Sequence, residues 1–227
     1  MTSEVRVPTK EDLEYLKIVP SAWVRDSVYR LKIGGCVMDG PLPLSPFGLG
    51  NKHVSGPART VQFMPSRSTG IKTYDVYADV IPSVNPGEVL VVAGNGIPGY
   101  AAGENQVNHS IQYGVAAWVT DMRMRDVAEI RNMGFPVLCA GGTPQGVGRD
   151  IVGINVPVHI AGAQVRAGDI IVADDDGAVA IPIEAFDQVL ANVRDAKEKE
   201  ARMEQLIKSN APPGEIAAYL ASKSQAI

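Results

Sequence analysis

The chain has 227 residues, of which 45% are apolar and 20% charged, an ordinary globular composition with room for one substantial domain. A net charge of −4 and a pI near 5.4 argue against a nucleic-acid or anionic membrane surface. No apolar run approaches 18 residues, and the first residues are polar and acidic. We therefore expect a cytoplasmic protein with neither a membrane span nor a secretory leader.

Two helices are predicted near the N-terminus. Thr9 is a candidate N-cap for a first short helix that Pro20 closes. Ser21 is expected to cap a second helix, which Gly34-Gly35 ends. Residues 39–56 are rich in proline and glycine and are expected to form a loop.

Two segments lead into the centre of the chain. Residues 58–64 alternate weakly and are predicted as a strand, whereas residues 73–84 favour a helix. The central stretch, 86–136, then begins with a buried strand at 89–93. Four glycines follow in ten residues, at Gly94, Gly96, Gly99 and Gly103.

Glu104 comes directly after this glycine-rich loop, and a helical pattern runs from Asn105 to Gly114. A second buried strand at 115–120 leads to Arg125 and Asp126 at the start of another helix. Because open α/β sheets place ligands outside the carboxyl ends of their strands, we expect Glu104, Arg125 and Asp126 to meet at one sheet edge.

The C-terminal half predicts a β-meander followed by a long helix. The expected strands are 136–140, 155–160, 164–165, 170–173 and 178–181, with a glycine-rich loop after the first. The helix runs from Ile183 to about Ser209, with an apolar stripe of Phe186, Val189, Leu190, Val193, Met203 and Ile207. Glu200 falls in the middle of that stripe, while Glu198 points outward. A short terminal helix within 211–227 completes the chain.

Three other features have mainly structural interpretations. Residues 174–177, with three consecutive aspartates and a glycine, lack the ligand spacing of a calcium loop and favour a hairpin turn. The letters of a dinucleotide fingerprint at 94–99 lack the immediate helix and the following acidic residue. Cys36 and Cys139 have no metal or redox spacing and are expected to be reduced, and the three histidines are too scattered to favour a metal site.

Arg125 and Asp126 taken alone fit a surface ion pair at a helix start. The residues expected beside them indicate a binding site instead. The backbone N–H groups of Asn105 and Gln106 begin a helix and can receive an anion. Carboxylates of Glu104 and Asp126 suit Mg²⁺ or Mn²⁺, and the guanidinium of Arg125 suits a carboxylate or an enolate oxygen. Together these groups would bind a 2-oxo acid.

The runs GENQVNHSIQYGVAAWVTDMRMRD, FPVLCAGGTP and VPVHIAGAQVRAGDIIVADDDGAVAIP resemble the RraA-like family, over about residues 21–200. That family includes class II 4-hydroxy-4-methyl-2-oxoglutarate/4-carboxy-4-hydroxy-2-oxoadipate aldolases and was formerly misnamed demethylmenaquinone methyltransferase. The resemblance implies an α/β fold, a layered sandwich of the swivelling β/β/α type with a mixed central sheet and a long C-terminal helix. It also implies a homotrimer or homohexamer with sites between subunits. Residues 1–227 would form one domain, with 183–227 a helical arm on a neighbouring subunit.

The resemblance also assigns roles. Asp126 would ligate Mg²⁺ or Mn²⁺, and Glu104 would act through metal-bound water. Arg125 would bind the keto or enolate oxygen, and the backbone around Gly103, Asn105 and Gln106 the substrate carboxylate. Glu200 is the best match for an acidic residue that an adjacent subunit contributes in the family.

This sequence departs from the aldolase pattern in several places. Met122 replaces a usual glycine, Asn105 and Gln106 stand where leucines are common, and Arg123 adds a cation. The loop 39–56 also differs. The hypothesis is a divalent-metal lyase that cleaves a 4-hydroxy-2-oxo acid to pyruvate and a carbonyl product, or decarboxylates oxaloacetate. The alternatives are a non-catalytic regulator of the ribonuclease-binding type, and another lyase or hydratase for an acidic substrate.

Overall fold

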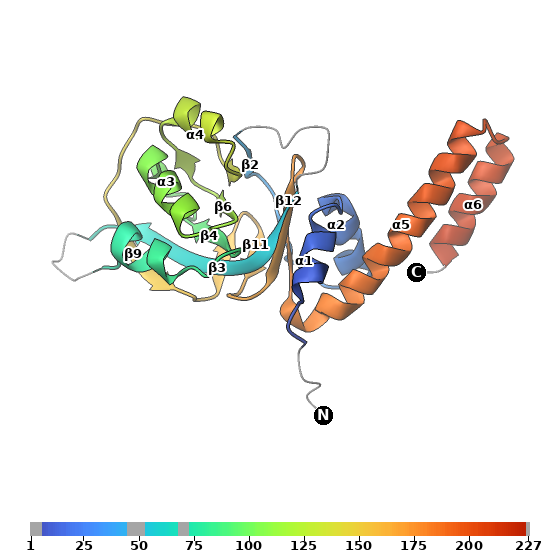
Figure 1. Cartoon of the computed structure of the whole chain (residues 1–227), viewed down its shortest axis with the longest axis horizontal. Coiled ribbons are helices and arrows are strands. Elements are labelled where there is room, and N and C mark those ends of the chain that lie inside the picture. Colours follow the sequence, from blue (N-terminus) through green and yellow to red (C-terminus); the bar gives the residue numbers. More distant parts are fainter. Residues whose placement is uncertain (1–5, 45–52, 68–72, 226–227) are drawn as a thin grey trace.

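The computed structural model describes residues 6–44, 53–67 and 73–225 (Figure 1). The helices are α1 (Lys10–Leu16), α2 (Ser21–Arg30), η1 (Val76–Val80, a π-helix), η2 (Ile81–Ser83) and η3 (Ile183–Ala185), both 3₁₀ helices, α3 (Glu104–Gln112), α4 (Val127–Met133), α5 (Phe186–Lys208) and α6 (Pro213–Gln225). The strands are β1 (Val37–Met38), β2 (Leu42–Pro43), β3 (Val54–Pro65), β4 (Val89–Ala93), β5 (Tyr100–Ala102), β6 (Ala117–Thr120), β7 (Arg123–Met124), β8 (Val137–Cys139), β9 (Arg149–Ile154), β10 (Val158–Ile160), β11 (Ala163–Val165), β12 (Ile170–Asp174) and β13 (Gly177–Ile181).

One large mixed sheet organises the described residues. Its order is β1-β13-β12-β3-β4-β6-β8-β2, and β9 pairs with the second half of β3. β3, β4, β6 and β8 are parallel to one another, whereas β12 and β9 run antiparallel to successive halves of β3. The ladders β10-β11 and β5-β7 lie outside this sheet. The predicted mixed α/β fold is confirmed.

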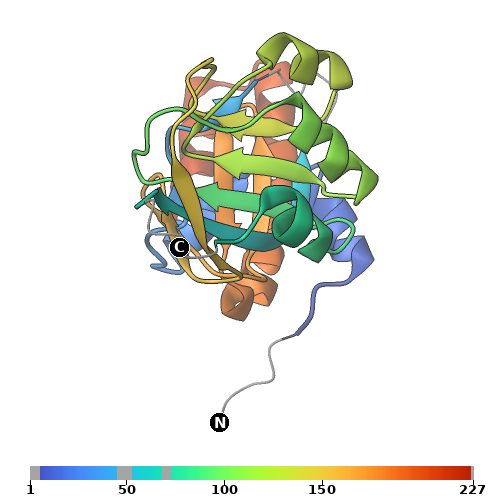
Figure 2. The same cartoon turned by 90° about the vertical axis from the view of Figure 1, so that its left-hand side faces the viewer.

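Strand alternation divides the interior into layers. In β4, Leu90 and Val92 face a core shared with α3 and α4, while Val91 faces a core that includes Ile171 and Ala180 from the β12-β13 half. The two halves of the sheet therefore pack on each other through one apolar layer. A third core joins β12 and β13 to α1, α2 and α5. Figure 2 shows α3, α4 and the short helix η1 together on the outer face of the β4-β6-β8 half.

The N-terminal predictions are confirmed for α1 and corrected for α2, whose N-cap is Pro20 instead of Ser21 and which ends at Arg30, before Gly34-Gly35. Thr9 caps α1 through a capping box in which Asp12 is the partner, and α2 begins at Ser21. The buried carboxylate of Asp174 accepts hydrogen bonds from the Ser21 backbone N–H and from Ser21 Oγ, both at 2.7 Å. The aspartate-rich turn is thus a structural hairpin that also anchors the start of α2.

Several expected boundaries are wrong. Within the expected loop 39–56, Leu42–Pro43 pairs with β8, and β3 begins at Val54, because these segments complete edges of the sheet; residues 45–52 lie outside the described part. The glycine-rich loop after β8 ends early, since Arg149–Ile154 pairs with β3. Residues 73–84 are helical only over η1 and η2.

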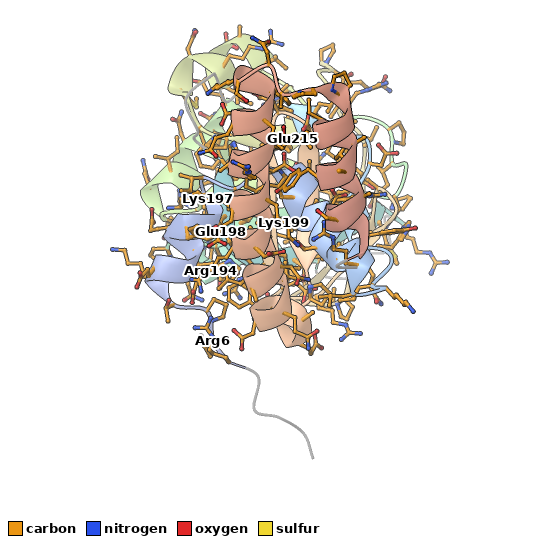
Figure 3. All side chains as sticks on the ribbon, turned by 90° about the vertical axis from the view of Figure 1, so that its right-hand side faces the viewer. Arg6, Arg194, Lys197, Glu198, Lys199 and Glu215 are labelled. Carbon is orange, nitrogen blue, oxygen red and sulfur yellow. The ribbon has the colours of Figure 1, made fainter. Side chains whose placement is uncertain are left out.

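The long C-terminal helix projects beyond the body, with α6 folded back beside it (Figure 1). Its apolar stripe departs from prediction in the last turn, where Leu206 is buried and Ile207 is 59% exposed. Glu198 is exposed as expected, on the charged face that Figure 3 shows. None of the helices in the described part of the chain has the length and apolarity that crossing a membrane requires.

Candidate active site

The site forms where two short parallel strands extend the edge of the main sheet. β4 and β6 are adjacent and parallel, and beyond their ends β5 pairs with β7. The backbone N–H of Arg125 continues this ladder by donating to Ala102 O at 3.0 Å. The residues that follow each strand, Gly103-Glu104 and Arg125-Asp126, therefore leave the ladder side by side.

Glu104 and Asp126 touch directly. The Glu104 backbone N–H donates to Asp126 Oδ2 at 3.1 Å. Asp126 has φ 56° and ψ 42°, a left-handed conformation that a non-glycine residue rarely adopts and that often marks a functional site. A Cβ on Gly103 would lie 2.5 Å from Asp126 Oδ2 and 2.9 Å from Arg125 Nε. Only glycine at 103 allows this close approach.

The Arg125 side chain is held at three points. Its Nε donates to Asp126 Oδ2 at 3.3 Å, and its Nη1 donates to Tyr100 Oη at 3.0 Å. Its Cζ also lies 4.7 Å from the centre of the Tyr100 ring. The side chain nevertheless remains 43% exposed, so the rest of the guanidinium fork is available to a ligand.

Sequence reasoning missed Tyr100 and Arg149. The Arg149 Cζ lies 5.1 Å from the Tyr100 ring centre and 5.4 Å from that of Phe63, and Arg149 Nη2 donates to Ala101 O at 2.8 Å. Burial lowers the pKa of Arg149, and Arg125 lowers it further. No salt bridge to a carboxylate holds Arg149 in the described part of the chain, so its contacts there are the carbonyl oxygen of Ala101 and the two aromatic rings. Arg149 follows a glycine-rich stretch without periodicity, so no local signal could have indicated its place.

The N-terminus of α3 is prepared for an anion. The Gly103 N–H donates to Gln106 Oε1 at 3.1 Å, which closes a cap. Ser110 Oγ donates to Gln106 O at 2.8 Å and accepts from Trp118 Nε1 at 2.9 Å, so buried groups steady this turn. With the N–H groups of Gly103 and Glu104 occupied, those of Asn105 and Gln106 are the first-turn donors left for an anion.

Residues 30–180 match the RraA-like family, described as Aldolase/RraA, which is well over half of the chain. The chain belongs to the RraA-like family. A Halalkalibacterium halodurans protein named "Putative 4-hydroxy-4-methyl-2-oxoglutarate aldolase" is 31% identical over 75% of this chain and 78% of its own length. The 4-hydroxy-4-methyl-2-oxoglutarate aldolase of Thermus thermophilus is 27% identical over 63% of this chain and 83% of its own.

Solved structures agree with this membership. The crystal structure of Streptomyces coelicolor RraAS2, described as an unusual member of the RNase ES inhibitor RraA protein family, superimposes with a TM-score of 0.78. It is 32% identical and the match covers 88% of this chain and 98% of that one. An uncharacterized Pseudomonas syringae protein shares the fold with a TM-score of 0.82 at 23% identity, over 96% and 98% of the two chains.

Two carboxylates at the site of this RraA-like chain, those of Asp126 and Glu104, could bind a hard divalent cation such as Mg²⁺. Asp126 uses Oδ2 for both of its contacts, which leaves Oδ1 for a ligand, and the Glu104 side chain starts beside it. Mg²⁺ commonly takes one or two carboxylates and keeps several waters, so two are sufficient. Within residues 6–44, 53–67 and 73–225 there is no group of three or more potential metal-binding side chains.

Glu200 is not brought to this site within one chain. It lies on α5, and Figure 1 shows α5 and α6 on the opposite side of the β12-β13 half from α3 and α4. Asp121 serves the loop instead of a ligand, since it accepts from the N–H groups of Gly94 and Asn95 at 2.6 and 2.8 Å. Those contacts fix the backbone at the start of the glycine-rich loop.

Proposed function

We propose that the protein is a divalent-metal-dependent lyase that cleaves a 4-hydroxy-2-oxo acid to pyruvate and a carbonyl product, with oxaloacetate decarboxylation as a related reaction. Two relatives with aldolase names support the reaction class. The observation that carries the proposal is the triply held Arg125 beside the Glu104–Asp126 contact. A fixed cation beside two carboxylates suits a reaction that develops negative charge on an oxygen.

Each group has a defined task in this proposal. Asp126 and Glu104 would hold Mg²⁺ or Mn²⁺, which when bound supplies Lewis-acid polarisation of the 2-oxo group. The N–H groups of Asn105 and Gln106 bind the substrate carboxylate. As the C3–C4 bond breaks, its electron pair moves toward the C2 oxygen, where the guanidinium of Arg125 neutralises the enolate charge. The 4-hydroxyl loses its proton, and C3 later gains one to form the methyl group of pyruvate.

Glu200 would assist proton transfer from a neighbouring subunit in a homotrimer or homohexamer. The arm formed by α5 and α6 supports this proposal, because its outer half extends away from its own body and leaves Ile207 and Leu220 about half exposed, at 59% and 48%. A second subunit that covers these residues could receive Glu200 near Arg125. The arm would then add Glu200 as a third carboxylate to a site in which one chain supplies only Glu104 and Asp126.

Mixing two inactive variants tests whether the site is shared. Arg125→Ala and Glu200→Gln are each expected to lose most activity. Co-expression of the two should restore part of it, because some interfaces then combine an intact Arg125 with an intact partner Glu200. If mixed oligomers stay as inactive as the parents while Glu200→Gln alone is inactive, the shared site is wrong.

The reaction is tested by pyruvate release from a panel of hydroxylated 2-oxo acids and oxaloacetate, with Mg²⁺, with Mn²⁺ and with chelator. The wild type should release pyruvate only with metal. Arg125→Ala should lower kcat/KM by at least about 100-fold with an unchanged melting temperature. Arg25→Ala is the matched control, since Arg25 pairs with Asp26 on the exposed face of α2. Wild-type turnover in Arg125→Ala would reject the assignment.

A protein-binding regulator is the second candidate. The 32% identity to a member of the RNase ES inhibitor RraA family favours it. Absence of pyruvate release from every acid in the panel, with or without metal, would support this candidate or a different lyase or hydratase. Turnover of another acidic substrate in the same conditions would separate those two.

A further inference from the structure

Tyr100 occupies an unusual position, because its ring lies against two guanidinium groups. Arg125 Cζ lies 4.7 Å and Arg149 Cζ 5.1 Å from the ring centre. Arg149 is in turn held by Ala101 O and stacks on Phe63. Tyr100 N donates to Gln145 O at 3.2 Å, so both the backbone and the ring are fixed. A side chain positioned by so many contacts is preorganised.

The hydroxyl of Tyr100 has one proton to donate. Its oxygen already accepts from Arg125 Nη1 at 3.0 Å. A phenol is both an acceptor and a donor, and no group in the described residues accepts its proton. Gly146 lies over this end of the ring, and its missing side chain keeps the space open, since a Cβ there would be 3.4 Å from Oη. The O–H therefore lies beside the guanidinium of Arg125, whose side chain is 43% exposed.

We infer that the Tyr100 hydroxyl is a second hydrogen-bond donor to the oxyanion that develops on the substrate's C2 oxygen, beside Arg125. This inference rests on the proposed function. Two donors that are fixed before the reaction stabilise an oxyanion without reorganisation, and a phenol can serve as one of them. Arg149 also contacts the Tyr100 ring and so helps to hold the phenol in place. The donor does not transfer its proton, so the electron balance of the cleavage is unchanged.

Tyr100→Phe tests the inference because it removes the hydroxyl and keeps the ring that both guanidinium groups contact. Two probes are titrated into the Mg²⁺-loaded protein: oxalate, whose planar dianion resembles the enolate of pyruvate, and pyruvate itself, whose C2 oxygen is neutral. The kcat for pyruvate release should fall about 100-fold, and oxalate should bind about 100-fold more weakly. Pyruvate affinity should change by less than about threefold. Tyr113→Phe, an exposed tyrosine after α3, should match the wild type.

Each other outcome has a defined meaning. Wild-type kcat and oxalate affinity in Tyr100→Phe would overturn the inference and leave the proposed function intact. Equal weakening of oxalate and pyruvate would also overturn it, because Tyr100 would then only orient Arg125. A wild type that neither releases pyruvate nor binds oxalate with Mg²⁺ would overturn the proposed function and this inference together. Melting temperatures of all variants identify any loss of folding.

Discussion

The backbone N–H of Glu104 and the carboxylate of Asp126 lie 3.1 Å apart, although 22 residues separate them in sequence. The contact joins the first residue of α3 to the residue that caps α4. It orients Asp126 in a left-handed conformation and leaves one of its oxygens open. This one hydrogen bond thus links the start of α3 to the start of α4. The chemistry proposed for this protein depends on the position that it gives to Asp126.

Gly103→Ala should damage the site without unfolding the protein. The added Cβ would lie 2.5 Å from Asp126 Oδ2, so Asp126 and Arg125 must move. A displacement of about 1 Å can lower turnover by about 100-fold, and we expect a loss of that size in pyruvate release. Gly34→Ala is the control, because nothing lies within 4 Å of a Cβ there. Full activity in Gly103→Ala would contradict the tight packing described.

Asp12→Asn should destabilise the protein in a pH-dependent way. Hydrogen bonds from Thr9, followed by Arg6, lower the pKa of Asp12 from 3.8 to about 2. A lowered folded-state pKa stabilises the protein above about pH 4, and this contribution is lost as the pH falls through about 2. At pH 7 the variant should lose about 1–2 kcal/mol of unfolding free energy. Figure 3 shows Arg6 near the base of α5.

Urea titrations at pH 7, 5 and 3 measure this effect. The difference between wild type and Asp12→Asn should shrink toward pH 3, since Asp12 begins to bind a proton in the unfolded state near pH 4. Asp26→Asn is the control, because Asp26 forms an exposed pair with Arg25. A difference that grows on acidification would show that the sign is wrong.

Asp174→Asn should affect stability and leave metal dependence alone. The Asp174 carboxylate is 6% exposed and accepts from Ser21 N, Ser21 Oγ and Asp176 N. An amide cannot accept all of these bonds as well, so we expect a loss of about 2 kcal/mol in unfolding free energy. The Mg²⁺ concentration for half-maximal activity should be unchanged. A large shift in that concentration would mean that the turn binds the cation.

Both cysteines should resist modification in the folded protein. Cys36 and Cys139 are free thiols that are 4% and 2% exposed, and burial raises the pKa of each above its usual 9.0. Little thiolate is therefore present at pH 8. A thiol reagent should label neither residue within minutes at pH 8, and both in urea. Rapid labelling of the native protein would contradict the burial.

Sequence by itself determined the elements whose signals are local. The apolar run of β4 and the Thr9 cap of α1 were predicted, because side-chain periodicity and capping depend on neighbouring residues. The aspartate-rich turn was also assigned correctly as a hairpin. The pairing of Glu104 with Asp126 followed from one further rule, that parallel strands end at a common edge.

Only the tertiary structure decided the rest. The strand β9 arises in a glycine-rich segment because β3 is long enough to pair with it, and that pairing brings Arg149 to Tyr100. The stacking joins residues 49 positions apart on different ladders, and no local pattern encodes it. Glu200 is half-buried on α5, and α5 lies on the other side of the β12-β13 half from α3 and α4. Periodicity specifies which face of an element is buried, whereas the partner of that face depends on how distant segments pack.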